Sequence, residues 1–175
     1  GSIHMSKVLV FGHQNPDNDA VMSAVVLAQL LNQVEFNGCT YEARALGPLP
    51  AESAKLLADA GLPEPMLLDA IEPAAEGEDP QQVILTDHNE PGQSVAGLAN
   101  AQIVGVVDHH RFGDFTTAAP LTIVAMPWGS SCTVVAKLFE VLGQELTDTQ
   151  AKLLLSAMMT DTLMLKSPTT TDVDR

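Results

Sequence analysis

The sequence predicts an α/β fold in which a parallel, mainly five-stranded sheet carries helices on both faces. Apolar runs of strand length alternate with longer helical patterns, the order that parallel sheets with right-handed crossovers require. Several of these runs end in clusters of Asp, His and Asn, and the carboxyl ends of parallel strands meet in one crevice. With 175 residues, 46% of them hydrophobic, the chain has the size of a single domain.

Five apolar runs have the length and composition of strands. They span residues 7–12, 41–46, 82–86, 103–107 and 121–126. The acidic, proline-containing stretch 71–80 predicts an exposed connection instead.

Helical patterns fill the intervals between strands and the end of the chain. A long aliphatic run at 20–33 predicts a helix with Asn18 or Asp19 as its N-cap. The other helical segments are 51–60, a short helix near 93–100, 131–142, and a helix from the capping box of Thr147 and Gln150 to about residue 165.

Charge and composition exclude several classes of function. The net charge of −14, from 22 acidic and 8 basic residues, argues against a nucleic-acid surface. No apolar run approaches the roughly 18 residues of a membrane span and the N-terminus lacks a secretory signal, so we expect a cytoplasmic protein without a membrane partner.

Cys39 and Cys132 lack paired spacing and are expected to be reduced. Residues 1–4 before Met5 read as a cloning remnant, which leaves 5–175 as the domain.

Clusters of carboxylates and imidazoles follow three of the predicted strands. His13, Asp17 and Asp19 follow the first, Asp87 follows the run 82–86, and a third cluster, Asp108, His109 and His110, closes the run 103–107. Imidazole and carboxylate together suit Mn, Fe, Co or Zn, so the pattern predicts a multinuclear metal site. In the alternative interpretation, Asp17 and Asp19 only cap the following helix.

Asp161 adds a carboxylate with apolar helical neighbours. An unpaired buried carboxylate costs several kcal/mol, a penalty that a metal ion would remove. In the alternative interpretation, Asp161 caps a local turn or pairs with Lys166 at the end of the helix. Asp17, Asp19, Asp87 and Asp161 carry four negative charges, which two divalent cations would balance. If Asp87 bridges two ions about 3.5–4 Å apart, water between them becomes hydroxide at neutral pH and can attack phosphorus.

Ser130, Ser131 and Cys132 follow Gly129 and open a predicted helix. Their backbone amides could hold a phosphate, or the segment could be an ordinary N-cap.

Four motifs together resemble the manganese-dependent (family II) inorganic pyrophosphatases of the Asp-His-His phosphoesterase superfamily. They are residues 12–19, 87–90, 108–110 and 156–162, and residues 166–169 are also similar to the family. The resemblance implies a Rossmann-like metal-binding domain and hydrolysis of pyrophosphate to two phosphates. Family members carry a second, basic domain that grips the substrate, so we expect this sequence, which ends at Arg175, to be the N-terminal domain alone and to turn over weakly.

The resemblance also implies roles for individual residues. His13 and Asp17 would bind a first metal, Asp19, His109 and Asp161 a second, and Asp87 both. His110 would face the substrate phosphate and Asp108 would orient the histidines. The implied cofactors are two Mn²⁺ ions, with Co²⁺ as an alternative and Mg²⁺ arriving with pyrophosphate, and the implied partner is a second copy of the chain, paired through the edge strand near 121–126.

Two other functions remain open at this stage. Related enzymes of the superfamily cleave short oligonucleotides or nucleoside bisphosphates with the same metal ligands. The chain could also be a metal-binding, dimerising module without turnover.

Overall fold

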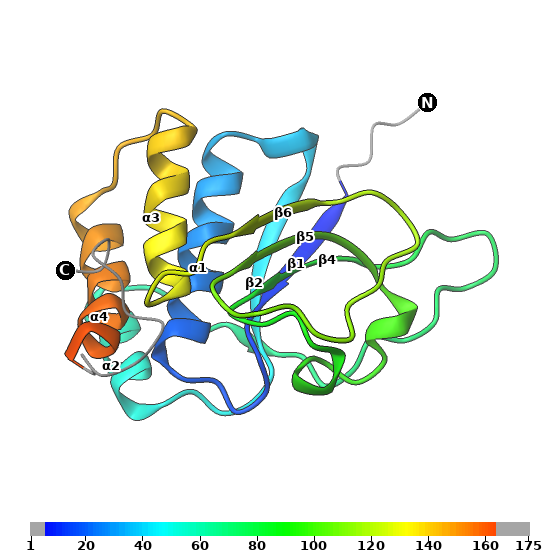
Figure 1. The fold of residues 1–175 in the computed structure, drawn as a ribbon, viewed down its shortest axis with the longest axis horizontal. Helices are drawn as coiled ribbons and strands as arrows, with labels where there is room; N and C mark the ends of the chain where they lie inside the picture. Colours follow the sequence, from blue (N-terminus) through cyan, green and yellow to red (C-terminus); the bar gives the residue numbers. More distant parts are fainter. Residues whose placement is uncertain (1–5, 164–175) are drawn as a thin grey trace.

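The structure is a computed structural model that describes residues 6–163, with side chains described for residues 6–158. Its centre is a six-stranded parallel sheet with the strand order β3-β2-β1-β4-β5-β6 (Figure 1). The strands are β1 (Lys7–Phe11), β2 (Thr40–Ala45), β3 (Met66–Leu67), β4 (Gln82–Thr86), β5 (Gln102–Asp108) and β6 (Thr122–Ala125). The predicted fold class is therefore confirmed. The extra strand, β3, has two residues, too few to carry a pattern.

Four α-helices cover one face of this sheet. They are α1 (Asn18–Gln33), α2 (Ala51–Asp59), α3 (Ser131–Val141) and α4 (Asp148–Leu163). Helix α1 lies at the centre of this layer, where thirteen of its sixteen residues are buried against strands and neighbouring helices. Within the described residues, no helix is long and apolar enough to cross a membrane.

The opposite face of the sheet is covered by single-turn 3-10 helices and loops, so of the helices predicted on both faces, the described α-helices lie on one face only. A second core cluster joins inward side chains of β1, β4 and β5, such as Phe11 and Leu85, to Ile71, Val95 and Leu98. The covering turns include the 3-10 helices η2 (Pro91–Gln93) and η3 (Leu98–Asn100), in place of the predicted short helix near 93–100. The helix is interrupted at Gly97, which has φ +78° and whose Cβ, if present, would overlap the Ile71 carbonyl. A third 3-10 turn, η1 (Phe36–Gly38), follows α1.

Of two predicted helix starts, the one of α4 is confirmed and the one of α1 is wrong. The capping box is confirmed, since the Gln150 amide donates to Thr147 Oγ1 at 3.1 Å and the Thr147 amide donates to Gln150 Oε1 at 3.1 Å. The N-cap predicted for α1 at Asn18 or Asp19 is wrong. Asp17 caps the helix and accepts from the Ala20 amide at 2.9 Å, because it stands three residues before the unpaired N–H group.

The strand order places a crevice between β1 and β4. From β1 the chain builds strands outward to one side, and from β4 it builds them outward to the other, so the connections diverge at this point. In open parallel sheets, such a switch point is where ligands bind at the carboxyl ends of the strands. The loop after β1 carries His13 and the loop after β4 carries Asp87, so two predicted ligands flank the crevice.

Candidate metal centre

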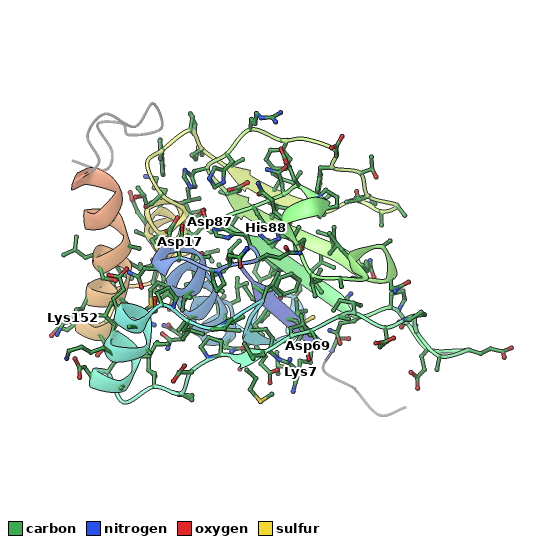
Figure 2. The ribbon with its side chains drawn as sticks, turned by 90° about the horizontal axis from the view of Figure 1, so that it is seen from below. Lys7, Asp17, Asp69, Asp87, His88 and Lys152 are labelled. Atoms are coloured by element: carbon green, nitrogen blue, oxygen red, sulfur yellow. The ribbon has the colours of Figure 1, made fainter. Side chains whose placement is uncertain are left out.

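A pocket of about 890 Å³ opens at the carboxyl ends of β1, β4 and β5. Figure 2 shows Asp17 and Asp87 close together at this end of the sheet and Lys7 at the other end. The lining residues include six predicted site residues: His13, Asp17, Asp19, Asp87, His109 and His110. The structure therefore brings together side chains from three separate loops.

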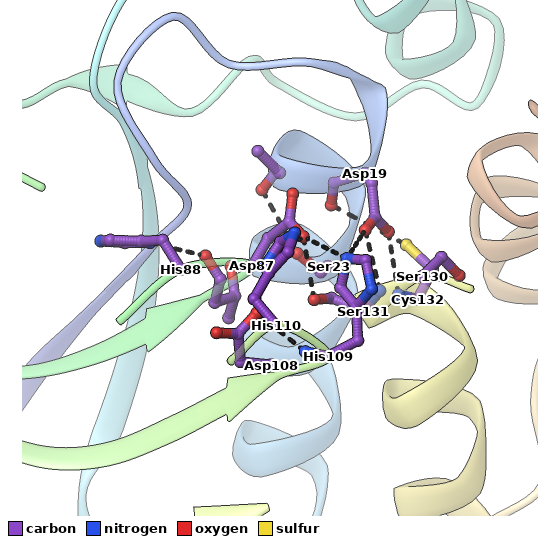
Figure 3. Close-up of polar contacts among 12 residues, drawn as sticks. Asp19, Ser23, Asp87, His88, Asp108, His109, His110, Ser130, Ser131 and Cys132 are labelled. Atoms are coloured by element: carbon purple, nitrogen blue, oxygen red, sulfur yellow. Dashed lines mark hydrogen bonds and ion pairs between the residues drawn. The ribbon is translucent and has the colours of Figure 1, made fainter. Parts of the chain in front are cut away.

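Asp87 occupies the middle of the centre and faces a histidine with each carboxylate oxygen. Its Oδ2 lies 3.2 Å from Nε2 of His13. Its Oδ1 lies 3.0 Å from Nε2 of His109 (Figure 3). Asp87 is buried and adopts φ +61°, a left-handed conformation that Asp tolerates better than most residues. This geometry would allow two cations to share the Asp87 carboxylate.

Backbone carbonyls fix the orientation of both histidines. Nδ1 of His13 donates to the Gln14 carbonyl at 2.7 Å, and Nδ1 of His109 donates to the Trp128 carbonyl at 2.9 Å. Each Nε2 therefore faces carboxylate oxygens, and a proton or a metal cation must lie between them. Such a hydrogen bond on the far nitrogen is typical of metal-binding histidines.

Without metal, protons take that place. The hydrogen bonds of His13 to Asp17 and Asp87 raise its pKa to about 11. Burial opposes protonation of His109, but its hydrogen bond to Asp87 and the charges of Asp87 and Asp19 outweigh burial and raise its pKa to about 9. The same two imidazoles hold the pKa of Asp87 far below its usual range despite complete burial.

Asp17 and Asp19 lie on opposite sides of Asp87. Asp17 is at the rim, 65% exposed, with Oδ1 3.6 Å from Nε2 of His13. Asp19 is buried, with Oδ2 3.8 Å from Nε2 of His109. Asp17 therefore both caps α1 and faces a histidine, so the capping that the alternative interpretation gave to both acids is observed for Asp17 alone.

The N-terminus of α3 holds Asp19. The amides of Ser131 and Cys132 donate to Asp19 Oδ2 and Oδ1 at 2.8 and 2.9 Å, and Ser130 Oγ accepts from the Thr133 amide at 3.1 Å. Of the two interpretations of this segment, the N-cap is thus the one observed. The helix amides also bind a carboxylate, which the sequence did not indicate.

Asp108 and His110 form a pair at the edge of the pocket. Nδ1 of His110 donates to Asp108 Oδ1 at 2.7 Å, and 43% of the His110 side chain is exposed. Asp108 is fully buried, and although burial opposes its ionisation, hydrogen bonds from His110 and Asn89 keep its pKa below the usual value. Asp108 thus orients an imidazole that reaches the pocket.

The structure gives contacts to two further residues, Ser131, which sequence patterns did not place at the centre, and His88, which belongs to the motif at 87–90. Ser131 Oγ donates to Asp87 Oδ1 at 3.1 Å. His88 is buried, donates from Nδ1 to the Thr86 carbonyl at 2.8 Å and accepts from Ser94 Oγ at 2.9 Å. Burial lowers the pKa of His88 to about 4, so it is a neutral structural link behind Asp87. The Ser131 contact joins residues 44 positions apart, so no local spacing predicts it, whereas both contacts of His88 lie within six residues of it in sequence.

The donor set fits divalent transition-metal ions. Two ligand atoms about 2.1 Å from an ion, at right angles, lie about 3.0 Å apart, and the facing N and O atoms here are 3.0–3.8 Å apart. His13, Asp17 and Asp87 form one compact group, and Asp87, Asp108, His109 and His110 form another. Asp161 belongs to α4, but its side chain lies outside the described residues, as do residues 166–169.

Comparison with known proteins identifies relatives over most of the chain. Residues 7–163 match the family described as "DHH family, N-terminal domain". A Lactobacillus helveticus protein is 43% identical over 171 residues, covering 98% of this chain and 52% of that protein, and a Streptococcus agalactiae protein is 45% identical over 166 residues, covering 95% and 51%. Both are named "probable manganese-dependent inorganic pyrophosphatase". The chain therefore spans about half the length of the curated relatives it matches.

Solved structures show the same fold. A Methanococcus jannaschii protein, provisionally assigned as a family II inorganic pyrophosphatase, superposes with a TM-score of 0.78 at 36% identity, covering 96% of this chain and 52% of that chain. An exopolyphosphatase-related protein from Bacteroides fragilis has a TM-score of 0.66 at 16% identity, covering 95% and 49%, which shows the fold alone.

Proposed function

We propose, from the premise that this chain belongs to the DHH family, that it carries the metal centre of a manganese-dependent hydrolase of inorganic pyrophosphate. One observation carries the proposal: each carboxylate oxygen of the buried Asp87 faces the Nε2 atom of a different histidine. The names of the relatives in L. helveticus and S. agalactiae support manganese and pyrophosphate as the metal and the substrate.

The proposed ligands divide between two ions. His13 and Asp17 would hold the first, Asp19 and His109 the second, and Asp87 both, with Asp161 assigned to the second from the family motif. Two bound Mn²⁺ ions would supply Lewis acidity and a nucleophile from water at neutral pH. Co²⁺ has similar ligand preferences and is the alternative metal, and Mg²⁺ would accompany the substrate.

Protein side chains bind and orient the substrate around these ions. Asp108 fixes Nδ1 of His110, which leaves Nε2 on the exposed side of this ring to meet a phosphate oxygen, as a hydrogen-bond donor in the doubly protonated ring. The lining carboxylates repel a free anion, so pyrophosphate binding depends on metal loading. Among the described lining residues, Arg111 is the one Lys or Arg. We therefore expect slow turnover by the 175-residue chain.

A phosphate-release assay with Mn²⁺ tests this function. The substrates are pyrophosphate, a short oligonucleotide and a nucleoside bisphosphate, each incubated with the wild-type chain, with Asp87→Asn, and with the control Asp59→Asn, which alters an exposed ion pair with Lys55. We expect pyrophosphate to be preferred, and activity to disappear in Asp87→Asn and persist in Asp59→Asn. Preference for either nucleotide substrate would contradict the proposal, and so would metal binding without any turnover.

We further propose that the protein is cytoplasmic, acts without nucleic-acid or membrane partners, and forms a homodimer through β6. The acidic net charge of −14 supports the absence of a nucleic-acid surface. The edge position of β6 supports the dimer.

A further inference from the structure

Asn89 is a buried amide in the wall of the pocket, with 1% of the residue exposed. It lies in the loop after β4, and its side chain reaches the segment after β5. Its Nδ2 donates to Asp108 Oδ2 at 2.8 Å and to the Arg111 carbonyl at 2.9 Å, while its Oδ1 accepts from the Gly113 amide at 3.0 Å. Because both amide hydrogens and the carbonyl oxygen bind one segment, Asn89 fixes that segment relative to β4.

The most consequential of these bonds is the one to Asp108. While Asn89 holds Oδ2, Oδ1 of the same carboxylate accepts from His110 Nδ1 at 2.7 Å and from the His109 amide at 2.8 Å. An amide, a carboxylate and an imidazole thus form a continuous hydrogen-bonded chain that ends at the pocket. Charge-assisted hydrogen bonds of this kind are about twice as strong as neutral ones, so the orientation of His110 depends on Asp108 being held.

We propose that Asn89 is a positioning residue whose amide holds the Asp108–His110 pair and residues 111–113 against β4, so that His110 presents Nε2 to a phosphate of the substrate. The assignment rests on the proposed function and deepens it. Asn89 acts through Asp108, and contact with the phosphate remains with His110. The loop it fixes also carries Arg111, which lies 3.4 Å from Glu90 at the pocket.

A double-mutant cycle tests whether Asn89 acts through His110. The probe is imidodiphosphate, a pyrophosphate analogue, binding to the Mn²⁺-loaded chain in calorimetry. We expect Asn89→Ala to weaken binding about tenfold in the wild-type background and less than about twofold in the His110→Ala background, with Mn²⁺ affinity changed less than about threefold. An equal loss in both backgrounds would overturn the proposal. Asn100→Ala is the matched control, because Asn100 likewise donates to a backbone carbonyl, that of Ile71 at 3.0 Å, away from the pocket.

Amide hydrogen exchange provides a readout that does not depend on substrate. Gly113 donates directly to Asn89, whereas His109 donates to Asp108. If Asn89 holds the Asp108 carboxylate, Asn89→Ala accelerates exchange at both amides, by about tenfold or more. If Asn89 has only a local structural role, the Gly113 amide alone is affected, which would overturn the proposal.

The outcomes separate this inference from the proposed function. A wild-type chain that binds Mn²⁺ but no imidodiphosphate would contradict the function, and the exchange experiment would still decide the role of Asn89. Asn89→Asp is the second variant, since it keeps an acceptor for Gly113 but places a carboxylate against Asp108, and it should weaken analogue binding too. If circular dichroism shows both variants unfolded, Asn89 serves the fold rather than His110, and the proposal is wrong.

Discussion

At the scale of single residues, the centre is defined by imidazole nitrogens that face carboxylate oxygens. His13 and His109 use Nδ1 on backbone carbonyls and turn Nε2 toward Asp87, so each contact requires a positive charge between the two atoms. In the metal-free chain that charge is a proton, and in the loaded chain it would be a metal ion. Metal binding and proton release are therefore linked.

This linkage predicts a pH dependence with a definite sign. With folded-state pKa values of about 11 and 9, His13 and His109 are protonated at pH 7, so binding of two Mn²⁺ ions should release about two protons and strengthen as the pH rises. The stability that these protonated rings give to the metal-free fold is fully present below their unfolded pKa of about 6.5 and is lost as the pH rises through about 9 and 11. Calorimetry in buffers with different ionisation enthalpies measures the number of protons released when Mn²⁺ binds. Binding without proton release would contradict the account.

The residue types of the site could be predicted from the sequence, but only part of their support could. His13, Asp17, Asp19 and Asp87 stand next to strands whose carboxyl ends had to converge, which is why their assembly was predictable. Asp108 was expected to orient a histidine, and Asn89 belongs to the motif at 87–90. The partners of Ser131 and Asn89, which lie 44 and 19 residues away at Asp87 and Asp108, depend on the final packing, so no local pattern predicts them.

At the scale of elements, the sequence predicts regular segments well and their ends less well. Five strands and four α-helices follow from periodicity, whereas β3 is too short for a pattern and the N-cap of α1 depends on which acid reaches the Ala20 amide. Helix α3 combines two functions at its first turn. Ser130 caps the helix, and Ser131 donates to Asp87 of the candidate metal centre.

The neighbouring serines of α3 therefore predict different variants. Ser130→Ala removes the N-cap and should lower the free energy of unfolding by about 1 kcal/mol while leaving Mn²⁺ affinity nearly unchanged. Ser131→Ala removes the hydrogen bond to Asp87 and should weaken Mn²⁺ binding by about 10–100-fold. Both residues are fully buried, so each serves as the control for the other. Thermal unfolding compares the stabilities of the two variants, and metal titration compares their Mn²⁺ affinities. Equal Mn²⁺ affinities in Ser130→Ala and Ser131→Ala would contradict the role given to Ser131.

At the scale of the whole molecule, β6 is an edge strand that pairs with β5 alone among the described residues. Ile123 in β6 and Met126 directly after it are 45% and 39% exposed. An exposed edge with apolar side chains is a template for another strand. This supports the proposed homodimer, in which two sheets would continue across β6.

Light scattering at micromolar concentration tests the dimer. The wild-type chain should have the mass of two chains, and Ile123→Lys should shift it toward one, because a charged edge residue opposes strand pairing. Leu155→Lys is the control, since Leu155 is also half exposed but lies on α4. A wild-type monomer, with or without Mn²⁺, would contradict the proposal.

The central claim is that Asp87 joins two metal ions in one centre, and Mn²⁺ titration of the demetallated chain tests it most directly. Calorimetry should show two ions per wild-type chain. In Asp87→Asn, which keeps the side-chain size, both affinities should fall by more than the roughly 10–100-fold typical of losing a ligand's hydrogen-bond partner. A single ion in the wild-type chain, or two ions whose affinities Asp87→Asn leaves unchanged, would contradict the shared carboxylate.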